Sequence, residues 1–465
     1  MNEESSAKRA HFVFIPLMAQ GHIIPAIDTA LLLCTRGALC SIIATPATAA
    51  RIRPSIEQSG LEVRLLEFPL EYVSDGADNM DNISAERVVG YFQAVALLRA
   101  PVEEHLRTHA PRVTCIVSDF CHPWTSALAA SLGVPRLSFL AIPALSALCE
   151  LEADQVDEPV MVPVPGWKKR VQLTRDQTAR FFSEPCWRAV RKEIYGAQAE
   201  VDGMILTTFL ELEPEYVRGF AAASGKQVWT VGPVSLHHQL TGVGGGLVKT
   251  ARGDAATVDA DEYLRWLDGK EGGSVVYVSF GTLAPTMEPE QLLELGLGLE
   301  ASGYPFIWVF NKADHLGEPQ LRQLQARVAG HGRIVTGWVP QLLILSHAAV
   351  GCFLTHCGWN SIMETIMTAK PVVTWPRLLD SDQPVNEKLV VDELGIGLSI
   401  RPKEPDMAVR REVIKAALTT VLCGGEEGQE MRTRVSELSL KATEAMQPGG
   451  SSHANLCDLV NRFTI

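Results

Sequence analysis

The sequence has few positive charges, and that shortage excludes one class of partner. Its 465 residues contain 41 Lys and Arg against 54 Asp and Glu, so the formal net charge at pH 7 is −13. Proteins that bind nucleic acids need clustered Lys and Arg to neutralise the phosphates. We therefore expect no nucleic-acid partner.

Long apolar runs are also missing. No uninterrupted apolar stretch reaches the ~18–20 residues that a membrane-spanning helix needs, so we expect no integral membrane segment. The apolar run at 11–19 follows Lys8 and Arg9 and could imitate a signal peptide. Two glutamates near the N-terminus oppose that interpretation, and Pro16 interrupts the run. A first β-strand in a cytoplasmic protein is the better interpretation.

Cysteine is sparse for a chain of this length. The 10 cysteines are scattered, mostly in apolar surroundings, which is typical of buried thiols in a reducing compartment rather than of a disulfide framework. The group Cys352, His356 and Cys357 invites a zinc interpretation. No second pair of ligands follows at zinc-finger spacing, so we expect no metal.

A dinucleotide-binding fingerprint is absent too. The first predicted strand, 11–17, is followed by Met-Ala-Gln-Gly-His at 18–22 instead of GlyxGlyxxGly. An oxidoreductase is therefore favoured only by the fold class, which hosts many activities.

The sequence does contain a clear alternation of predicted strands and helices. Apolar runs of strand length in the first half lie at 41–45 and 113–118, and a Gly-ended loop leads into a helix that ends at Cys34. In the second half strands are expected at 274–280, 306–310, 333–336, 350–355, 371–375 and 397–400. Helical patterns fall between them at 288–302, 318–329, 341–347, 360–368 and 383–394, and two more follow at 408–423 and 427–446. This alternation predicts an α/β fold with two facing, Rossmann-like doubly wound parallel sheets and a cleft between them.

A glycine cluster marks the expected division of the chain. Four of the five residues at 242–246 are Gly, which is typical of a flexible linker. We expect an N-terminal domain over 1–240, a linker over 241–247, a C-terminal domain over 248–446 and a C-terminal helix within 447–465 that packs back on the N-terminal domain.

The densest cluster of polar and aromatic residues follows the strand predicted at 350–355. His356 and Gly358 lie in the loop after that strand, and a helix is expected to begin near Asn360 or Ser361. Free N–H groups at a helix start bind anions, a glycine lets a ligand approach the backbone, and a histidine can donate to a phosphate. The cluster suits a diphosphate held without a metal.

Simpler interpretations exist for single members of this cluster. Ser361 and Glu364 have the spacing of a capping box, in which Glu364 would only satisfy a backbone donor. Trp338 could be a core residue. Asp380 and Asp382 form an Asp-x-Asp triplet, a pattern that some glycosyltransferases use to hold a metal diphosphate but that is also common in solvated turns.

A His–Asp pair is predicted at the other sheet. His22 follows a Gly turn at the end of the first strand, and Asp119 ends another strand of the same predicted sheet. A carboxylate beside an imidazole fixes its tautomer and stabilises its protonated form, so His22 could act as a general base near neutral pH.

Taken together, these motifs resemble the signature of plant family-1 UDP-dependent glycosyltransferases, which have the GT-B fold. The resemblance covers 338–383 almost without a break, through Trp-Val-Pro-Gln at 338–341, Thr-His-Cys-Gly-Trp-Asn-Ser at 355–361 and Trp-Pro at 375–376. Further matches, such as Trp-Thr-Val-Gly-Pro at 229–233 and Ser-Phe-Gly-Thr at 279–282, extend it over nearly the whole chain.

The resemblance implies a role for each position that matches. His22 would be the catalytic base and Asp119 its partner, and the N-terminal domain would bind the acceptor. The residues implied in binding the UDP-sugar are Thr282, Trp338, Val339, Gln341, His356, Gly358, Trp359, Asn360, Ser361, Glu364, Asp382 and Gln383. Uracil would stack on Trp338, the ribose would bind Glu364, and the sugar would contact Trp359, Asp382 and Gln383.

The implied activity is inverting, metal-independent transfer of a sugar, with glucose as the default, to a small lipophilic acceptor such as a flavonoid, phenylpropanoid, terpenoid or hormone. No cofactor is expected besides the UDP-sugar substrate, and we expect a monomer. The segment between Trp375-Pro376 and Asp382 is two residues longer than the family pattern, which affects the sugar contacts most. The alternatives are a UDP-sugar sensor without turnover and the same enzyme using another UDP-sugar.

Overall fold

The structure is a computed structural model of the chain. It describes residues 9–70, 80, 83, 87–153, 160–165, 170–173, 188–236, 252, 260–283, 285–310, 317–379, 381–402 and 407–464. The expected linker over 241–247 lies outside these residues, as do Asp380 and several residues at the expected domain boundary. The chain forms two parallel sheets and a small antiparallel hairpin.

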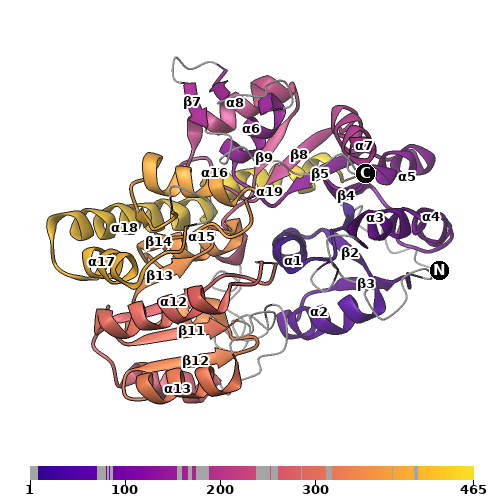
Figure 1. Ribbon diagram of the computed structural model, residues 1–465. Coiled ribbons are helices and arrows are strands. Elements are labelled where there is room, and N and C mark those ends of the chain that lie inside the picture. Colours follow the sequence, from indigo (N-terminus) through magenta and orange to yellow (C-terminus); the bar gives the residue numbers. More distant parts are fainter. Residues whose placement is uncertain are drawn as a thin grey trace.

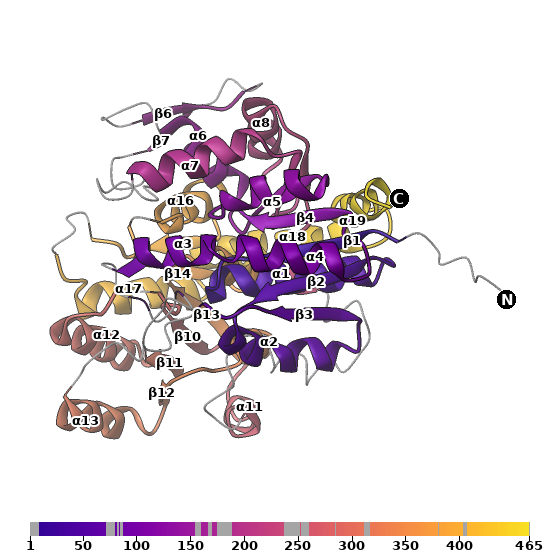
Figure 2. The ribbon, with the colours of Figure 1, turned by 90° about the vertical axis from the view of Figure 1, so that its right-hand side faces the viewer.

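The first sheet contains seven parallel strands in the order β3-β2-β1-β4-β5-β8-β9. These strands are β1 (His11–Ile15), β2 (Leu39–Ala44), β3 (Val63–Glu67), β4 (Cys115–Asp119), β5 (Arg136–Leu140), β8 (Gly203–Leu206) and β9 (Val228–Thr230). The helices of this half are α1 (Gln20–Cys34), α2 (Pro46–Ser59), α3 (Val88–Ala96), α4 (Arg99–Thr108), α5 (Trp124–Leu132), α6 (Ala144–Ala153), α7 (Arg188–Ala199) and α8 (Pro214–Ser224), with the short helix η5 (Val234–Leu236). Figures 1 and 2 show α3, α4, α5 and α7 together on the outer side of this half.

The second sheet contains six parallel strands in the order β12-β11-β10-β13-β14-β15. They are β10 (Val275–Ser279), β11 (Phe306–Phe310), β12 (Gly332–Thr336), β13 (Val350–Thr355), β14 (Val372–Thr374) and β15 (Gly397–Ser399). The helices are α11 (Ala260–Asp268), α12 (Pro289–Ser302), α13 (Glu318–Val328), α14 (Gln341–Leu345), α15 (Trp359–Met367), α16 (Gln383–Lys388), the π-helical turn η6 (Leu389–Glu393), α17 (Arg411–Leu422), α18 (Glu426–Met446) and α19 (Ser451–Arg462).

Three of the central strands are buried along their whole length. All residues of β1, β4 and β10 are buried, which is why their sequences read as continuous apolar runs. In each sheet the strand order reverses beside the first strand, between β1 and β4 and between β10 and β13. Ligands of doubly wound sheets bind at the carboxyl ends of the strands at such reversal points.

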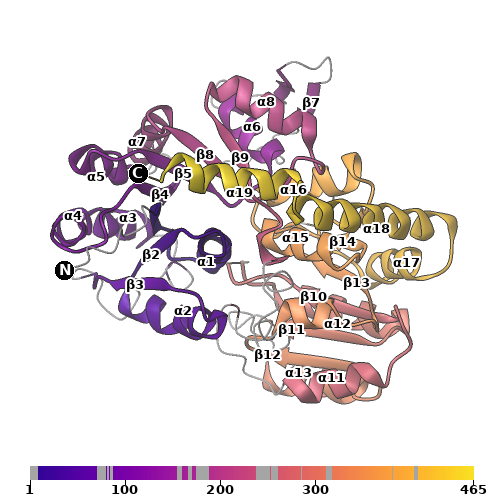
Figure 3. The same ribbon diagram turned by 180° about the vertical axis from the view of Figure 1, so that it is seen from behind.

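The two halves meet at α1 and α15, which lie side by side between the sheets. A second contact joins α6 of the first half to α16 of the second. The C-terminal helix α19 leaves the second half and runs along the first beside β9 (Figure 3). There Asn455 donates to the Thr230 carbonyl at 2.9 Å, and the Phe463 ring packs edge-on against Phe12.

The structure corrects one detail of the sequence prediction in the first half. Three prolines and Gly166 within 151–170 predict an irregular segment there. The structure instead has a strand, β6 (Val160–Pro163), which pairs with β7 (Arg170–Leu173) in an antiparallel hairpin. Nine cysteines lie among the described residues and all are free. Within the same residues, no helix combines the length and apolarity that crossing a membrane requires.

Candidate active site between the two sheets

His22 and Asp119 meet at the reversal point of the first sheet. His22 lies in the first turn of α1, directly after β1, and Asp119 is the last residue of the neighbouring strand β4. His22 Nδ1 is 2.7 Å from Asp119 Oδ2. The imidazole keeps 24% of its side-chain surface exposed, whereas the carboxylate has none. A buried carboxylate therefore orients an imidazole that a second molecule can reach.

The surroundings of Asp119 keep it ionised despite its burial. Burial alone would raise the pKa of Asp119, but His22, His122 and the Cys121 N–H, which donates to Oδ1 at 3.1 Å, together lower it. Because an ionised Asp119 accepts the Nδ1–H of His22, the lone pair of neutral His22 lies on Nε2. The Phe120 ring stacks on the His22 ring, with 6.4 Å between the ring centroids. Sequence patterns did not indicate this contact.

His356 lies at the reversal point of the second sheet, between two glycine-containing loops. A Cβ atom added at Gly281, after β10, or at Gly358, after β13, would lie only 2.5 Å from His356 Nε2. Gly281 also has a left-handed φ of +74°, a conformation that favours glycine. Both glycines therefore let the backbone surround the imidazole closely. We call His356 with the Gly281 and Gly358 loops the histidine cradle.

The start of α15 completes this cradle. The helix begins at Trp359 after Gly358, and no side chain caps its first N–H groups. These groups and the helix dipole favour an anion. Burial lowers the pKa of His356 to about 4, opposed in part by the Ser279 backbone. His356 is thus a neutral hydrogen-bonding group at pH 7.

Glu364 does not form the capping box with Ser361. The helix begins at Trp359, two residues before Ser361, so the capping interpretation is wrong. Instead, Gln341 Nε2 donates to Glu364 Oε2 at 2.9 Å and to Ser361 Oγ at 3.1 Å. Gln341 and Glu364, predicted for the nucleoside, thus form one hydrogen-bonded group with Ser361, predicted for the diphosphate.

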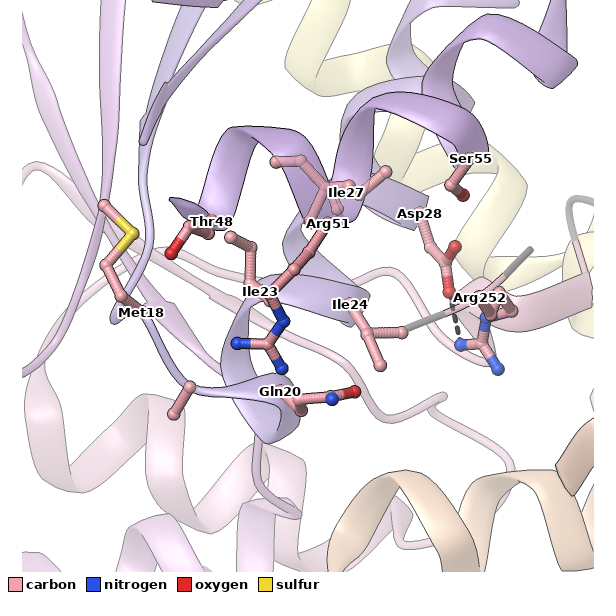
Figure 4. Close-up of a pocket in the computed structure, with 12 residues that line it drawn as sticks. Met18, Gln20, Ile23, Ile24, Ile27, Asp28, Thr48, Arg51, Ser55 and Arg252 are labelled. Carbon is pink, nitrogen blue, oxygen red and sulfur yellow. Dashed lines mark hydrogen bonds and ion pairs between the residues drawn. The ribbon is translucent and has the colours of Figure 1, made fainter. Parts of the chain in front are cut away.

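A residue that sequence patterns missed completes this group. Arg252 forms an ion pair with Glu364. A second ion pair, at 2.5 Å, joins Arg252 to Asp28 of α1 (Figure 4). All three side chains are at least nine-tenths buried. The two carboxylates raise the pKa of Arg252 although burial opposes this. Arg252 lines a pocket with Gln20 and Asp28, and a second pocket with Thr207 and Asn360.

The remaining residues predicted to bind the nucleotide lie along the same edge. Trp338, half-buried, and Val339, buried, lie between β12 and α14. Thr282 is exposed in the loop after β10, next to Gly281. Asn360 connects this edge to the other half, because its Nδ2 donates to the Gly21 carbonyl at 2.8 Å.

The residues predicted to contact the sugar gather at the start of α16. Gln383 Oε1 accepts the N–H groups of Arg377 and Leu378 at 2.9 and 3.0 Å. Its carbonyl therefore shapes the lengthened loop and only its amide nitrogen remains to donate elsewhere. The Trp359 Nε1 is buried and has no hydrogen-bond partner within the described parts of the chain. Burial raises the pKa of Asp382 to about 6, against the opposing effects of Asn386 and His22.

Phe139 belongs to the core of the first sheet: it is buried, and its ring centroid lies 6.3 Å from that of Phe14. In the described residues no group of three or more His, Cys, Asp or Glu side chains could hold a metal ion. Cys352, His356 and Cys357 thus do not form a zinc-type cluster there.

Comparisons with known proteins cover nearly the whole chain. Residues 226–426 match the family described as UDP-glucoronosyl and UDP-glucosyl transferase. UDP-glycosyltransferase 73C6 of Arabidopsis thaliana is 37% identical over 485 residues, which cover 97% of this chain and 95% of that relative.

Solved structures share the fold. The crystal structure of UGT73P12 from Glycyrrhiza uralensis, complexed with glycyrrhetinic acid 3-O-monoglucuronide, has a TM-score of 0.86 and 32% identity and covers 98% of this chain and 96% of its own. Os79 from O. sativa in complex with UDP has a TM-score of 0.80 and 27% identity, with coverage of 97% and 100%. The predicted pair of facing Rossmann-like domains is thereby confirmed.

Proposed function

The chain belongs to the family of UDP-glucoronosyl and UDP-glucosyl transferases, and on that premise we propose that it moves glucose from UDP-glucose to a small lipophilic plant acceptor. Flavonoids, phenylpropanoids, terpenoids and hormones are the acceptor classes that the sequence resemblance favours. The complex of the Glycyrrhiza relative with a glycyrrhetinic acid glucuronide supports a small lipophilic acceptor. We further propose that the enzyme acts in the cytoplasm as a monomer.

One observation carries this proposal: the His22–Asp119 pair lies next to the start of α15. Gly21, the residue before His22, accepts a hydrogen bond from Asn360 in the first turn of α15. A base with its carboxylate partner is thus joined to an anion-binding helix start from the other half. Acceptor and donor held on these two elements would react across the contact between them.

In the proposed mechanism, His22 acts as general base. Nε2 takes the proton of an acceptor hydroxyl, and Asp119 stabilises the imidazolium that forms. The acceptor oxygen attacks the anomeric carbon from the face opposite UDP, so one bond forms, the bond to UDP breaks and the configuration inverts. The charge on the departing UDP is held by the N–H groups of α15 and by neutral His356, without a cation.

The proposed donor contacts follow the three parts of the substrate. Trp338 and Val339 hold the uracil, while Gln341 and Glu364 hold the ribose. The diphosphate lies against His356, Gly358, Asn360, Ser361 and Thr282. Trp359, Asp382 and Gln383 hold the glucose, with Gln383 restricted to donating by the bonds that its carbonyl already accepts.

The second candidate is a UDP-sugar sensor without turnover. It would need the histidine cradle but neither His22 nor Asp119. A buried carboxylate at 2.7 Å from a partly exposed imidazole is an arrangement that binding alone does not require. We therefore favour the enzyme.

A mass-spectrometric screen tests the proposal. Plant phenolics, terpenoids and thiols are incubated with the protein and UDP-glucose, UDP-galactose, UDP-xylose or UDP-glucuronate, with EDTA or Mn²⁺ in parallel. We expect glucosides from UDP-glucose that form equally well in EDTA. UDP binding without any product would support the sensor, and activity lost in EDTA but restored by Mn²⁺ would contradict the metal-free mechanism.

A further inference from the structure

Asn386 is a buried residue to which neither the sequence motif nor the proposed mechanism gives a role. It lies in α16, one turn after Asp382, and its side chain is completely inaccessible to solvent. A buried amide must have hydrogen-bond partners, because an unsatisfied one destabilises the fold. Its partners therefore indicate what its position depends on.

Asn386 uses every hydrogen bond that its nitrogen can make. Nδ2 donates to Asp382 Oδ2 at 2.7 Å and to the Cys357 carbonyl at 2.9 Å. On the other side, Oδ1 accepts the Ser146 hydroxyl of α6 at 3.0 Å. Two acceptors face Nδ2 and a donor faces Oδ1, so the orientation of the amide is fixed by its partners.

These three partners belong to different parts of the proposed site. Asp382 is the proposed sugar ligand. Cys357 lies between His356 and Gly358 in the histidine cradle and has a left-handed φ of 68°, which a residue with a side chain rarely adopts. Ser146 is in the first half of the molecule, on α6, whose first N–H groups at Ala144 and Leu145 bond to Glu213.

We propose that Asn386 is a positioning residue. It holds the sugar-binding carboxylate of Asp382 and the diphosphate loop at Cys357 in fixed positions relative to α6 of the first half. This inference rests on the proposed function and assigns a new residue to the same site. Asn386 itself does not touch the substrate. Its effect reaches the sugar and the diphosphate through Asp382 and Cys357.

The contacts limit which part of the donor should depend on Asn386. The uridine contacts proposed at Trp338, Gln341 and Glu364 come from other elements and share no hydrogen bond with it. Loss of Asn386 should therefore weaken the hold on glucose and on the departing diphosphate but leave uridine recognition intact. A general loss of folding would affect all of these together.

Two substitutions change the amide in different ways. Asn386→Ala removes all three bonds, whereas Asn386→Asp keeps the shape but places a second carboxylate against Asp382 and the Cys357 carbonyl. We expect Asn386→Ala to lower kcat about 30-fold and raise the KM for UDP-glucose about 10-fold, and Asn386→Asp to be at least as severe. The Kd for uridine, which lacks the diphosphate, should stay within about twofold of the wild-type value when measured by calorimetry.

Ser146→Ala tests the connection between the halves and is a mild change if the Asn386 variants fold poorly. It removes only the bond to Oδ1, so we expect a three- to tenfold lower kcat with an unchanged Kd for uridine. In the double variant Ser146→Ala/Asn386→Ala the loss should equal that of Asn386→Ala alone, because both changes break one network. Asn455→Ala is the matched control: it breaks a bond between α19 and β9 away from the site and should leave kcat unchanged.

The outcomes separate this inference from the proposed function. If the wild-type protein transfers no sugar from any UDP-sugar, the proposed function is overturned and the inference with it. If the wild-type protein is active, wild-type kcat in both Asn386 variants overturns the inference alone. A Kd for uridine that weakens in parallel with the KM for UDP-glucose would also overturn it, because the role of Asn386 would then be general folding.

Discussion

The pair of His22 and Asp119 gives the sharpest prediction at the scale of single residues. Asp119→Asn keeps the size of the side chain but removes the charge that orients and stabilises the imidazole. We expect kcat to fall by at least ~100-fold, in the range typical of general-base catalysis, with little change in the KM for UDP-glucose. Steady-state kinetics measure both values.

Non-additivity is the check on this pair. Adding His22→Ala to Asp119→Asn should lower kcat little further, because Asp119 acts only through His22. If the two losses multiply, or if Asp119→Asn keeps the wild-type kcat, the carboxylate has another role.

The raised pKa of Asp382 predicts how the KM for UDP-glucose depends on pH. Its pKa, raised by burial to about 6, means that the carboxylate takes up a proton as the pH falls through 6 and then accepts the sugar hydroxyls less well. The KM for UDP-glucose should therefore rise below pH 6. Its titratable neighbours are His22 of α1, whose protonation should lower kcat instead, and the Cys357 thiol. In Asp382→Asn the KM should be high and independent of pH from about 5 to 7; a KM that still varies there would contradict this assignment.

Some site residues could be predicted from the sequence and others could not, for a physical reason. His22 and Asp119 each follow a strand, and neighbouring parallel strands bring their ends together. Arg252 pairs with residues 112 and 224 positions away, and Asn386 bonds to Ser146 at a separation of 240. No local pattern marks such partners, because they depend on how the two halves pack.

At the scale of elements, the histidine cradle predicts that Gly281 cannot be replaced. Gly281→Ala would place a Cβ 2.5 Å from His356 Nε2, so the imidazole must move away from the loop. We expect the affinity for UDP to fall by more than ~10-fold, about 1.4 kcal/mol. Isothermal titration calorimetry measures this directly.

Gly303 is a matched control for this substitution. It has the same φ of +74° but nothing within 4 Å of an added Cβ. Gly303→Ala should lower the free energy of unfolding by about 1 kcal/mol and leave UDP affinity unchanged. Equal losses of affinity in the two variants would show that backbone strain, not contact with His356, is responsible.

The elements themselves were predictable where they are buried. The strands expected at 306–310 and 350–355 are β11 and β13 without correction, because a strand covered on both faces is a continuous apolar run. The β6–β7 hairpin was missed, since each of its strands has four residues and β6 ends in a proline. Its pairing depends on contacts that no periodicity in the sequence shows.

At the scale of the whole molecule, Arg252 joins the two halves through buried charges. Arg252→Met would leave Asp28 and Glu364 buried without a counter-charge. We expect the free energy of unfolding to fall by about 3 kcal/mol, measured as a lower melting temperature. Asp28→Asn in this background should recover part of the loss, because it removes one of the two unpaired charges.

The exposed pair of Arg218 and Glu215 provides the control. Its arginine is 62% exposed, so Arg218→Met should change stability by less than about 0.5 kcal/mol. If Arg252→Met is no more destabilising than this control, the buried ion pairs do not hold the halves together.

The most direct test of the central claim compares His22→Ala with the wild-type enzyme on UDP-glucose and the best acceptor from the screen. The account predicts that glucoside formation falls about 1000-fold, while the Kd for UDP stays within about twofold because the donor contacts are on the other half. His22→Ala turning over at the wild-type rate would contradict it.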